Sequence, residues 1–159
     1  MPTRLCALGA NDTVELEHVR GFFRQYAAWL GVDLSFQGFA DEIANLPGAY
    51  GAADGRLFYA EVDGKPAGCV GIRRFSEGVC EMKRLYVDPA FRGGGVGRKL
   101  ALAAIKAARL FGYRRILLDT IPSMRIAVKL YRELGFKEAP AYYPSPIEGA
   151  IFLTLDLEN

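Results

Sequence analysis

The sequence is poor in the residues that build disulfide frameworks and metal sites. It contains only three cysteines and one histidine in 159 residues. Cys6, Cys69 and Cys80 show no metal-like spacing, and two of them fall in strand-like runs, so we expect reduced thiols and no metal. The chain also lacks a run of membrane-spanning length and an N-terminal basic region followed by an apolar one. These absences predict a cytoplasmic protein with no membrane partner.

A strong excess of one charge is lacking as well. The net charge is +2, whereas a dedicated nucleic-acid binder carries a much larger basic excess, so no nucleic-acid partner is expected. A hydrophobic share of 51% and a charged share of 24% are ordinary for a globular protein. The length predicts a single domain over residues 1–159.

The most informative segment spans residues 81–100. An alternating run from Met82 to Val87 predicts a strand, which Asp88 and Pro89 end because proline has no N–H and restricts the preceding residue. A glycine-rich loop follows, and then an alanine-rich helical pattern. This order presents bare backbone N–H groups at a positive helix end, which suits a phosphate-bearing anion.

Spacing separates the kinds of phosphate loop. A P-loop needs a Lys-Ser or Lys-Thr pair after its glycines, and none follows here. The dinucleotide fingerprint Gly-x-Gly-x-x-Gly can be read from Gly93 or from Gly95. Its last glycine would then fall on Arg98 or on Leu100, so neither register fits. What remains is Arg-x-x-Gly-x-Gly at Arg92, Gly95 and Gly97. The alternative is a turn that only caps the helix, but four glycines in five positions cost chain entropy unless the backbone approaches something closely.

Positive charge gathers in the sequence near this loop. The basic residues expected to surround the glycines are Lys83, Arg84, Arg92, Arg98 and Lys99. Either they contact an anionic ligand or they form a solvated basic face.

Hydrophobic periodicity predicts the other elements. The expected helices cover residues 13–30, 39–46, 96–110 and 123–134, and the expected strands cover residues 3–8, 56–62, 65–75, 116–118 and 149–157. Thr13 and Ser123 are the expected N-caps, and Leu110 is expected on the apolar face of its helix. Asp63 and Gly64 predict a tight hairpin, and strand, helix and strand in succession predict a parallel pair.

Two segments resemble one known family. Arg92, Gly95 and Gly97 resemble motif A of the GNAT superfamily of acyl-CoA-dependent N-acetyltransferases, which reads Gln/Arg-x-x-Gly-x-Gly/Ala after a strand. Residues 130–136, Leu-Tyr-Arg-Glu-Leu-Gly-Phe, resemble its motif B. The resemblance covers roughly residues 56–157. It implies an α+β, GNAT-like acyl-CoA N-acyltransferase fold with a mixed, mostly antiparallel central sheet and helices on both faces.

The resemblance also implies acetyl-CoA as cosubstrate. Backbone groups of Leu85 and Val87 would hold the pantetheine arm as an added strand, and an N–H near Val87 would polarise the thioester carbonyl. The full expected coenzyme-binding set is Leu85, Tyr86, Val87, Arg92, Gly93, Gly94, Gly95, Val96, Gly97, Arg98 and Lys99. Many members contact the arm with an asparagine seven positions before the motif B tyrosine. That position is Met124 here, so the contact is absent or supplied by Asp119, Thr120 or Ser123.

Two residues are the catalytic candidates. Tyr131 matches the tyrosine of motif B and would protonate the departing thiolate, for which a phenol is suitable; the alternative is a packed tyrosine with a satisfied hydroxyl. Glu81 stands where some histone-type members carry a base, and would take a proton from the acceptor ammonium directly or through water. Simple alternation puts Glu81 on one side with Lys83, Leu85 and Val87. Its alternative role is a charge pair with Lys83, Arg84 or Arg73.

The acceptor side is less defined. Tyr142 and Tyr143, in a proline-containing segment, and Arg73 are candidate substrate contacts, and the tyrosines could equally cover the end of the core. The predicted function is transfer of an acetyl group from acetyl-CoA to a primary amine of a small molecule or protein, by a monomer or homodimer. Its rivals are a non-catalytic acyl-CoA-binding or regulatory module and an interaction protein with a vestigial loop.

Overall fold

The computed structural model describes residues 2–31 and 33–157, so residues 1, 32 and 158–159 of the predicted domain lie outside the described residues. The helices are α1 (Thr13–Leu30), α2 (Phe39–Ala44), α3 (Val96–Leu110) and α4 (Arg125–Glu133), with single turns η1 (Ser35–Gln37), η2 (Gly48–Gly51) and η3 (Pro89–Phe91). The strands are β1 (Thr3–Ala7), β2 (Arg56–Val62), β3 (Lys65–Ser76), β4 (Val79–Val87), β5 (Arg115–Thr120), β6 (Lys137–Glu138) and β7 (Ile151–Asp156).

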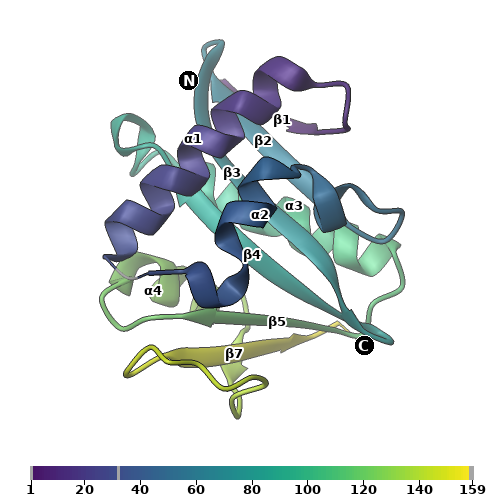
Figure 1. Cartoon of the computed structure of the whole chain (residues 1–159), viewed down its shortest axis with the longest axis vertical. Helices are drawn as coiled ribbons and strands as arrows, with labels where there is room; N and C mark the ends of the chain where they lie inside the picture. The colour runs from purple at the N-terminus through teal and green to yellow at the C-terminus, as the bar shows by residue number, and fades with distance from the viewer. Residues whose placement is uncertain (1, 32, 158–159) are drawn as a thin grey trace.

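The strands form a mixed sheet in the order β1-β2-β3-β4-β5-β7-β6 (Figure 1). Neighbours are antiparallel except β4 and β5, which lie parallel because α3 crosses between them. The hairpin between β2 and β3 turns at Asp63 and Gly64, whose φ angles are 51° and 76°. The predicted fold class, hairpin and parallel pair are therefore confirmed. Strand β6 was not predicted, since two residues are too few to show a periodicity.

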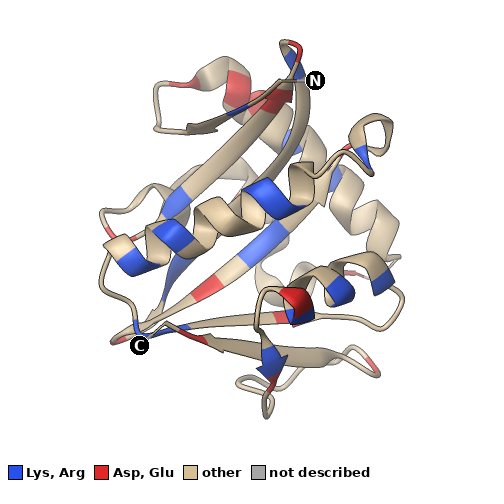
Figure 2. Ribbon diagram, turned by 180° about the vertical axis from the view of Figure 1, so that it is seen from behind, with Lys and Arg blue, Asp and Glu red and all other residues tan. Residues whose placement is uncertain are grey.

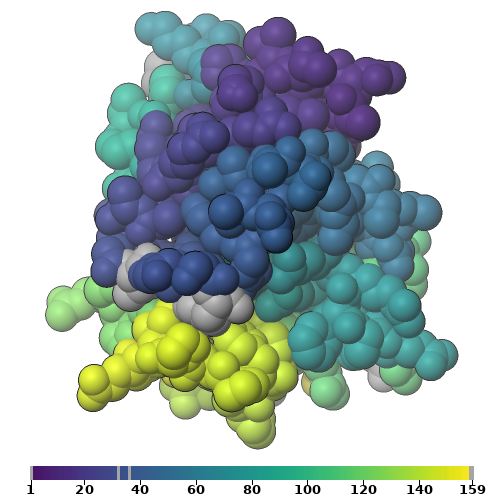
Figure 3. Space-filling model, in the orientation of Figure 1, coloured from purple at the N-terminus to yellow at the C-terminus, as the bar shows by residue number. Residues whose placement is uncertain are grey.

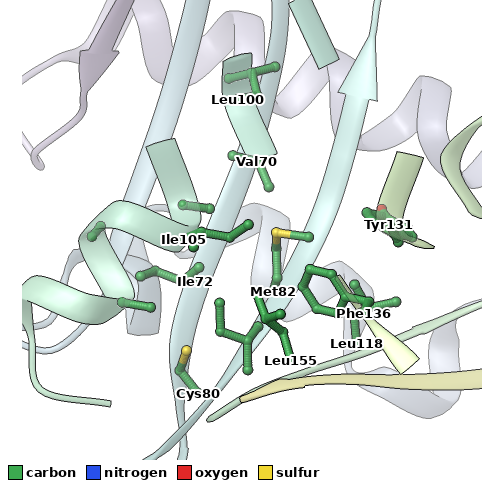
Figure 4. Packing of buried hydrophobic residues seen from close by; sticks show 14 of the residues in the cluster. Val70, Ile72, Cys80, Met82, Leu100, Ile105, Leu118, Tyr131, Phe136 and Leu155 are labelled. Carbon is green, nitrogen blue, oxygen red and sulfur yellow. The ribbon is translucent and has the colours of Figure 1, made fainter. Parts of the chain in front are cut away.

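Helices cover both faces of the sheet. Helices α1 and α2 lie on one face, where a core of aromatic and aliphatic side chains includes Phe23, Tyr50 and Tyr59. Helix α3 lies on the other face, and Figure 4 shows Leu100 and Ile105 of this helix near Val70 and Ile72 of β3. Within the described residues, no helix combines the length and apolar character needed to cross a bilayer. Cys69 and Cys80 are buried, and all three cysteines are free.

Several predicted helix details were wrong. Helix α1 begins with Thr13 itself, while the preceding Asp12 accepts the Gly9 N–H at 2.7 Å instead of capping the helix. Helix α4 begins at Arg125, so Ser123 is not its cap, and α2 ends at Ala44. Leu110 is 76% exposed, because the buried stripe of α3 runs through its alanines and leaves this position on the solvent side.

Candidate active site

Strand β4 carries a β-bulge in its middle. Lys83 lies opposite Gly71 and Tyr86 opposite Cys69, so Arg84 and Leu85 together face the single residue between those two on β3. Arg84 adopts a left-handed φ of 62° to make this possible. The extra residue reverses the alternation, so Leu85 packs against the α3-side core while Tyr86 belongs to the α1-side core. The prediction that Glu81 shares its side with Leu85 and Val87 was therefore wrong.

Strands β4 and β5 pair only at their beginnings and then diverge (Figure 1). The pairing covers Val79–Glu81 against Arg115–Leu117. The Asp88 N–H donates to the Ala67 carbonyl at 2.8 Å on the β3 side. Because edge directions alternate along a strand, the N–H and C=O of Val87 point to the opposite, diverging edge. Arg92 Nε already donates to that Val87 carbonyl at 2.9 Å.

A narrow cavity lies where the strands diverge. Its volume is about 20 Å³, which is room for roughly one water molecule. The wall on the β4 side consists of Met82, Lys83, Arg84 and Leu85, and the other walls of Tyr26, Trp29, Asp119, Thr120, Met124, Ala127 and Tyr131. The cavity therefore joins α1, both diverging strands and α4 at one point.

Tyr131 reaches this cavity from α4 and is only 7% exposed. Its ring packs against Phe136 at 5.7 Å between centroids, and Figure 4 shows the two side by side. Burial raises the pKa of Tyr131 well above its usual value of 10, and the charge of Asp119 adds to the effect. At neutral pH the phenol therefore keeps its proton and is a donor.

Six side chains of alternating charge form a continuous row on the α1 and α2 side of the sheet. We call them the charge row; in spatial order they are Arg84, Glu42, Arg73, Glu81, Lys83 and Asp119. Nε and Nη2 of Arg84, which is 3% exposed, donate to Glu42 at 2.9 and 3.0 Å. Because a buried charge without a partner is costly, each member depends on its neighbours.

Glu81 sits inside the charge row and is 5% exposed. Arg73 Nη2 lies 3.1 Å from its Oε1, and the Tyr142 hydroxyl donates to its Oε2 at 2.6 Å. The structure thus contains both the Arg73 and the Lys83 charge pairs considered above, whereas Arg84 pairs with Glu42. Among the described residues that line the cavity, the acidic one is Asp119 and not Glu81.

The loop of residues 139–150 covers both carboxylates. The Tyr143 hydroxyl donates to Asp119 Oδ2 at 2.5 Å, and the Tyr142 hydroxyl lies 3.5 Å from Asp119 Oδ1. Gln37 of η1 donates to the Tyr143 hydroxyl at 3.3 Å, and Figure 3 shows the yellow-green loop meeting the blue segment that contains α2. Burial and the adjacent carboxylates raise the pKa of both tyrosines, so both remain protonated donors.

Lys83 bridges the two carboxylates. Its Nζ lies 3.7 Å from Glu81 Oε2, 3.4 Å from Asp119 Oδ1 and 3.1 Å from Gln37 Oε1, although the residue is only 6% exposed. Burial lowers the pKa of this ammonium below 10.5, and the two carboxylates only partly oppose the effect. Lys83 and Arg84 therefore do not surround the glycine loop, and that prediction was wrong.

The glycine loop leads into the N-terminus of α3. Gly93 and Gly95 have φ of 87° and 85°, which glycine adopts without strain. Gly94 and Gly97 have no such φ, and a Cβ there would meet only ordinary contacts of 3.5 Å or more. Arg98 donates to Glu133 of α4 at 2.5 Å, while Lys99 is exposed. Basic positions recur along α3 and α4 (Figure 2).

Trp29, at the end of α1, was not predicted as part of the site. It is 48% exposed, lines the cavity and carries the Arg92 guanidinium 4.4 Å above its ring. Glu42 was missed as well, since a glutamate within a short polar helix gives no signal of its partners.

Comparison with known proteins identifies the family. The model of the acetyltransferase (GNAT) family matches residues 21–136. The chain belongs to this family. An uncharacterized N-acetyltransferase of Schizosaccharomyces pombe is 36% identical over 160 residues, which cover 99% of this chain and 98% of that protein. The protein is accordingly an acyltransferase of the GNAT type.

Solved structures share the fold. An acetyltransferase from Streptococcus agalactiae is 22% identical with a TM-score of 0.80, covering 98% of each chain. The PaiA N-acetyltransferase from Thermoplasma acidophilum, solved in complex with coenzyme A, is 16% identical with a TM-score of 0.76 and covers 98% of this chain and 99% of its own. At these identities the likeness extends to the architecture, including the sheet and its flanking helices.

Proposed function

We propose that this GNAT protein transfers an acetyl group from acetyl-CoA to a primary amine of a small molecule or a protein. The observation that carries the proposal is the divergence of β4 from β5, which leaves an open strand edge beside the cavity that Tyr131 lines. The glycine loop begins a few residues beyond that edge.

The residues present fit the coenzyme. The edge groups of Val87 can pair with the amides of a pantetheine arm, as in strand addition. The N–H groups at the start of α3 suit a pyrophosphate. Gly94 and Gly97 need glycine neither for φ nor to avoid a clash with a protein neighbour, and this supports a ligand that approaches the backbone there. A neighbour of the same fold in complex with coenzyme A adds further support.

Residues at the cavity can carry out the steps of acetyl transfer. The acceptor ammonium gives a proton to Asp119, which lines the cavity. Glu81 can receive this proton from Asp119, because the Tyr142 hydroxyl lies 2.6 Å from Glu81 Oε2 and 3.5 Å from Asp119 Oδ1. The free amine attacks the thioester, whose carbonyl oxygen accepts a hydrogen bond from the β4 edge. Tyr131, a protonated phenol that lines the cavity, donates to the departing thiolate.

The test is thiol release from acetyl-CoA against a broad panel of amines, with wild type and Tyr131→Phe. General-acid catalysis contributes about 10²–10⁴-fold, so kcat of the variant should fall at least about 100-fold with little change in coenzyme affinity. Tyr113→Phe is the matched control, because this tyrosine donates to the Asp54 carbonyl outside the cavity. Undiminished turnover in Tyr131→Phe would remove the acid assignment, and absence of acetyl-CoA binding in calorimetry would refute the proposed function.

A further inference from the structure

The candidate active site already holds a primary amine of its own. Lys83 borders the same cavity as Tyr131, and its Nζ lies 3.4 Å from Asp119. Asp119 and Tyr131 both line that cavity as well. The amine and the proposed acid therefore lie near a common carboxylate. This is the arrangement that amine acylation requires of an external acceptor.

The surroundings of Lys83 favour loss of its proton. Burial lowers the pKa of the ammonium, which increases the fraction of nucleophilic amine at neutral pH. Two carboxylates are within 3.7 Å to take the proton, and Gln37 Oε1 at 3.1 Å can hold the remaining N–H. The other five lysines, Lys65, Lys99, Lys106, Lys129 and Lys137, are all exposed.

We propose that Lys83 is a self-acylation site, at which the protein transfers the acyl group of a bound acyl-CoA thioester to its own Nζ. The inference rests on the proposed function, since the same bound thioester is the donor. The reaction is intramolecular, because a side chain that is 6% exposed cannot enter the site of another molecule.

The ammonium of Lys83 first gives one proton to Glu81, which leaves Asp119 ionised, and the neutral amine attacks the thioester carbon. The N–C bond forms and the C–S bond breaks, while Tyr131 protonates the thiolate. The second amine proton passes through Asp119 back to the Tyr131 phenolate. The products are an amide at Lys83, the free thiol of coenzyme A and one released proton.

Self-acylation has a consequence for turnover. It removes the positive charge between Glu81 and Asp119 and leaves an acyl group beside the cavity that an external acceptor would enter. The modified protein should therefore accept external amines poorly, which makes the reaction self-limiting at one acyl group per chain.

The test is incubation of the full chain with acetyl-CoA and no added amine, followed by peptide mass mapping. Uncatalysed acetylation follows exposure, so it would label Lys106 and Lys137 first and Lys83 last. The proposal predicts the reverse order, with a first-order rate that is independent of protein concentration. Tyr131→Phe should slow labelling of Lys83 by about 100-fold and leave Lys106 and Lys137 unaffected.

Two variants complete the test. Lys83→Arg keeps the cation in the charge row but cannot be acylated, so the rapid modification should vanish, whereas Lys106→Arg should retain it. If Lys83→Arg fails to fold, the mapping on wild type still decides. Calorimetry with acetyl-CoA runs in parallel. Binding without preferential labelling of Lys83 overturns the self-acylation proposal alone, and absence of binding overturns the proposed function as well.

Discussion

Replacing Glu42 with glutamine should destabilise the protein by about 3–5 kcal/mol, the usual cost of removing one partner from a buried ion pair. The Glu42 carboxylate accepts both Arg84 bonds and the Tyr50 hydroxyl at 3.0 Å. Glutamine keeps the shape but turns one acceptor into an N–H donor that faces another donor. Arg84 then remains buried in the β4 bulge with its charge uncompensated.

Urea unfolding measured by circular dichroism would give the change in the free energy of unfolding. The control is Asp156→Asn, which breaks an ion pair of 3.1 Å whose side chains are 54% and 70% exposed. An exposed pair contributes at most about 1 kcal/mol, so the control should stay within that range. A Glu42→Gln protein within about 1 kcal/mol of wild type would refute the claim that buried Arg84 depends on Glu42 for charge compensation.

The pH dependence of the free energy of unfolding tests the Glu42–Arg84 pair independently. Burial by itself would raise the pKa of Glu42, but the hydrogen bonds and charge of Arg84 outweigh it, and the pKa lies below 4.5. A carboxyl group with a lowered folded-state pKa stabilises the protein above its unfolded-state pKa, and this stability is lost as the pH falls through the folded-state value. Wild type should therefore lose stability more steeply than Glu42→Gln below about pH 4.5.

Three further outcomes test the site. Gly97→Ala should stabilise α3 by up to about 1 kcal/mol yet weaken acetyl-CoA binding at least about tenfold in calorimetry. Gly21→Ala, at a position of α1 where a Cβ meets nothing within 4 Å, should leave affinity unchanged. Equal affinities of the Gly97→Ala protein and wild type would mean that no ligand approaches Gly97. Glu81→Gln should lower kcat most at low pH, where free amine is scarce, and an unaltered pH–rate profile would return Glu81 to a structural role. Trp29 is the single tryptophan, so its emission should change as coenzyme A displaces Arg92 from the Val87 carbonyl. A flat fluorescence titration despite calorimetric binding would show that Arg92 stays in place.

Features that depend on neighbouring residues could be predicted from the sequence. The Asp63-Gly64 hairpin, the glycine loop and the helical periodicity of α1 follow from backbone preferences that act over a few residues. The spacing of Arg92, Gly95 and Gly97 and the Leu-Tyr…Gly-Phe segment carried the resemblance to the family, which the comparison confirmed. Helix caps were less predictable, because Asp12 found a partner in its own turn rather than in α1.

Features that depend on distant partners were decided by the tertiary structure. Arg84 enters the bulge because β3 fixes the register and because Glu42, far away in the sequence, compensates its charge. Asp119 approaches Lys83 only because β5 pairs with the beginning of β4 and then diverges. Electrostatic partners of this kind leave no periodicity in the sequence. The sequence by itself therefore determined the family and the acyl donor that we propose, while the tertiary structure decided which carboxylates, tyrosines and amine meet at the cavity.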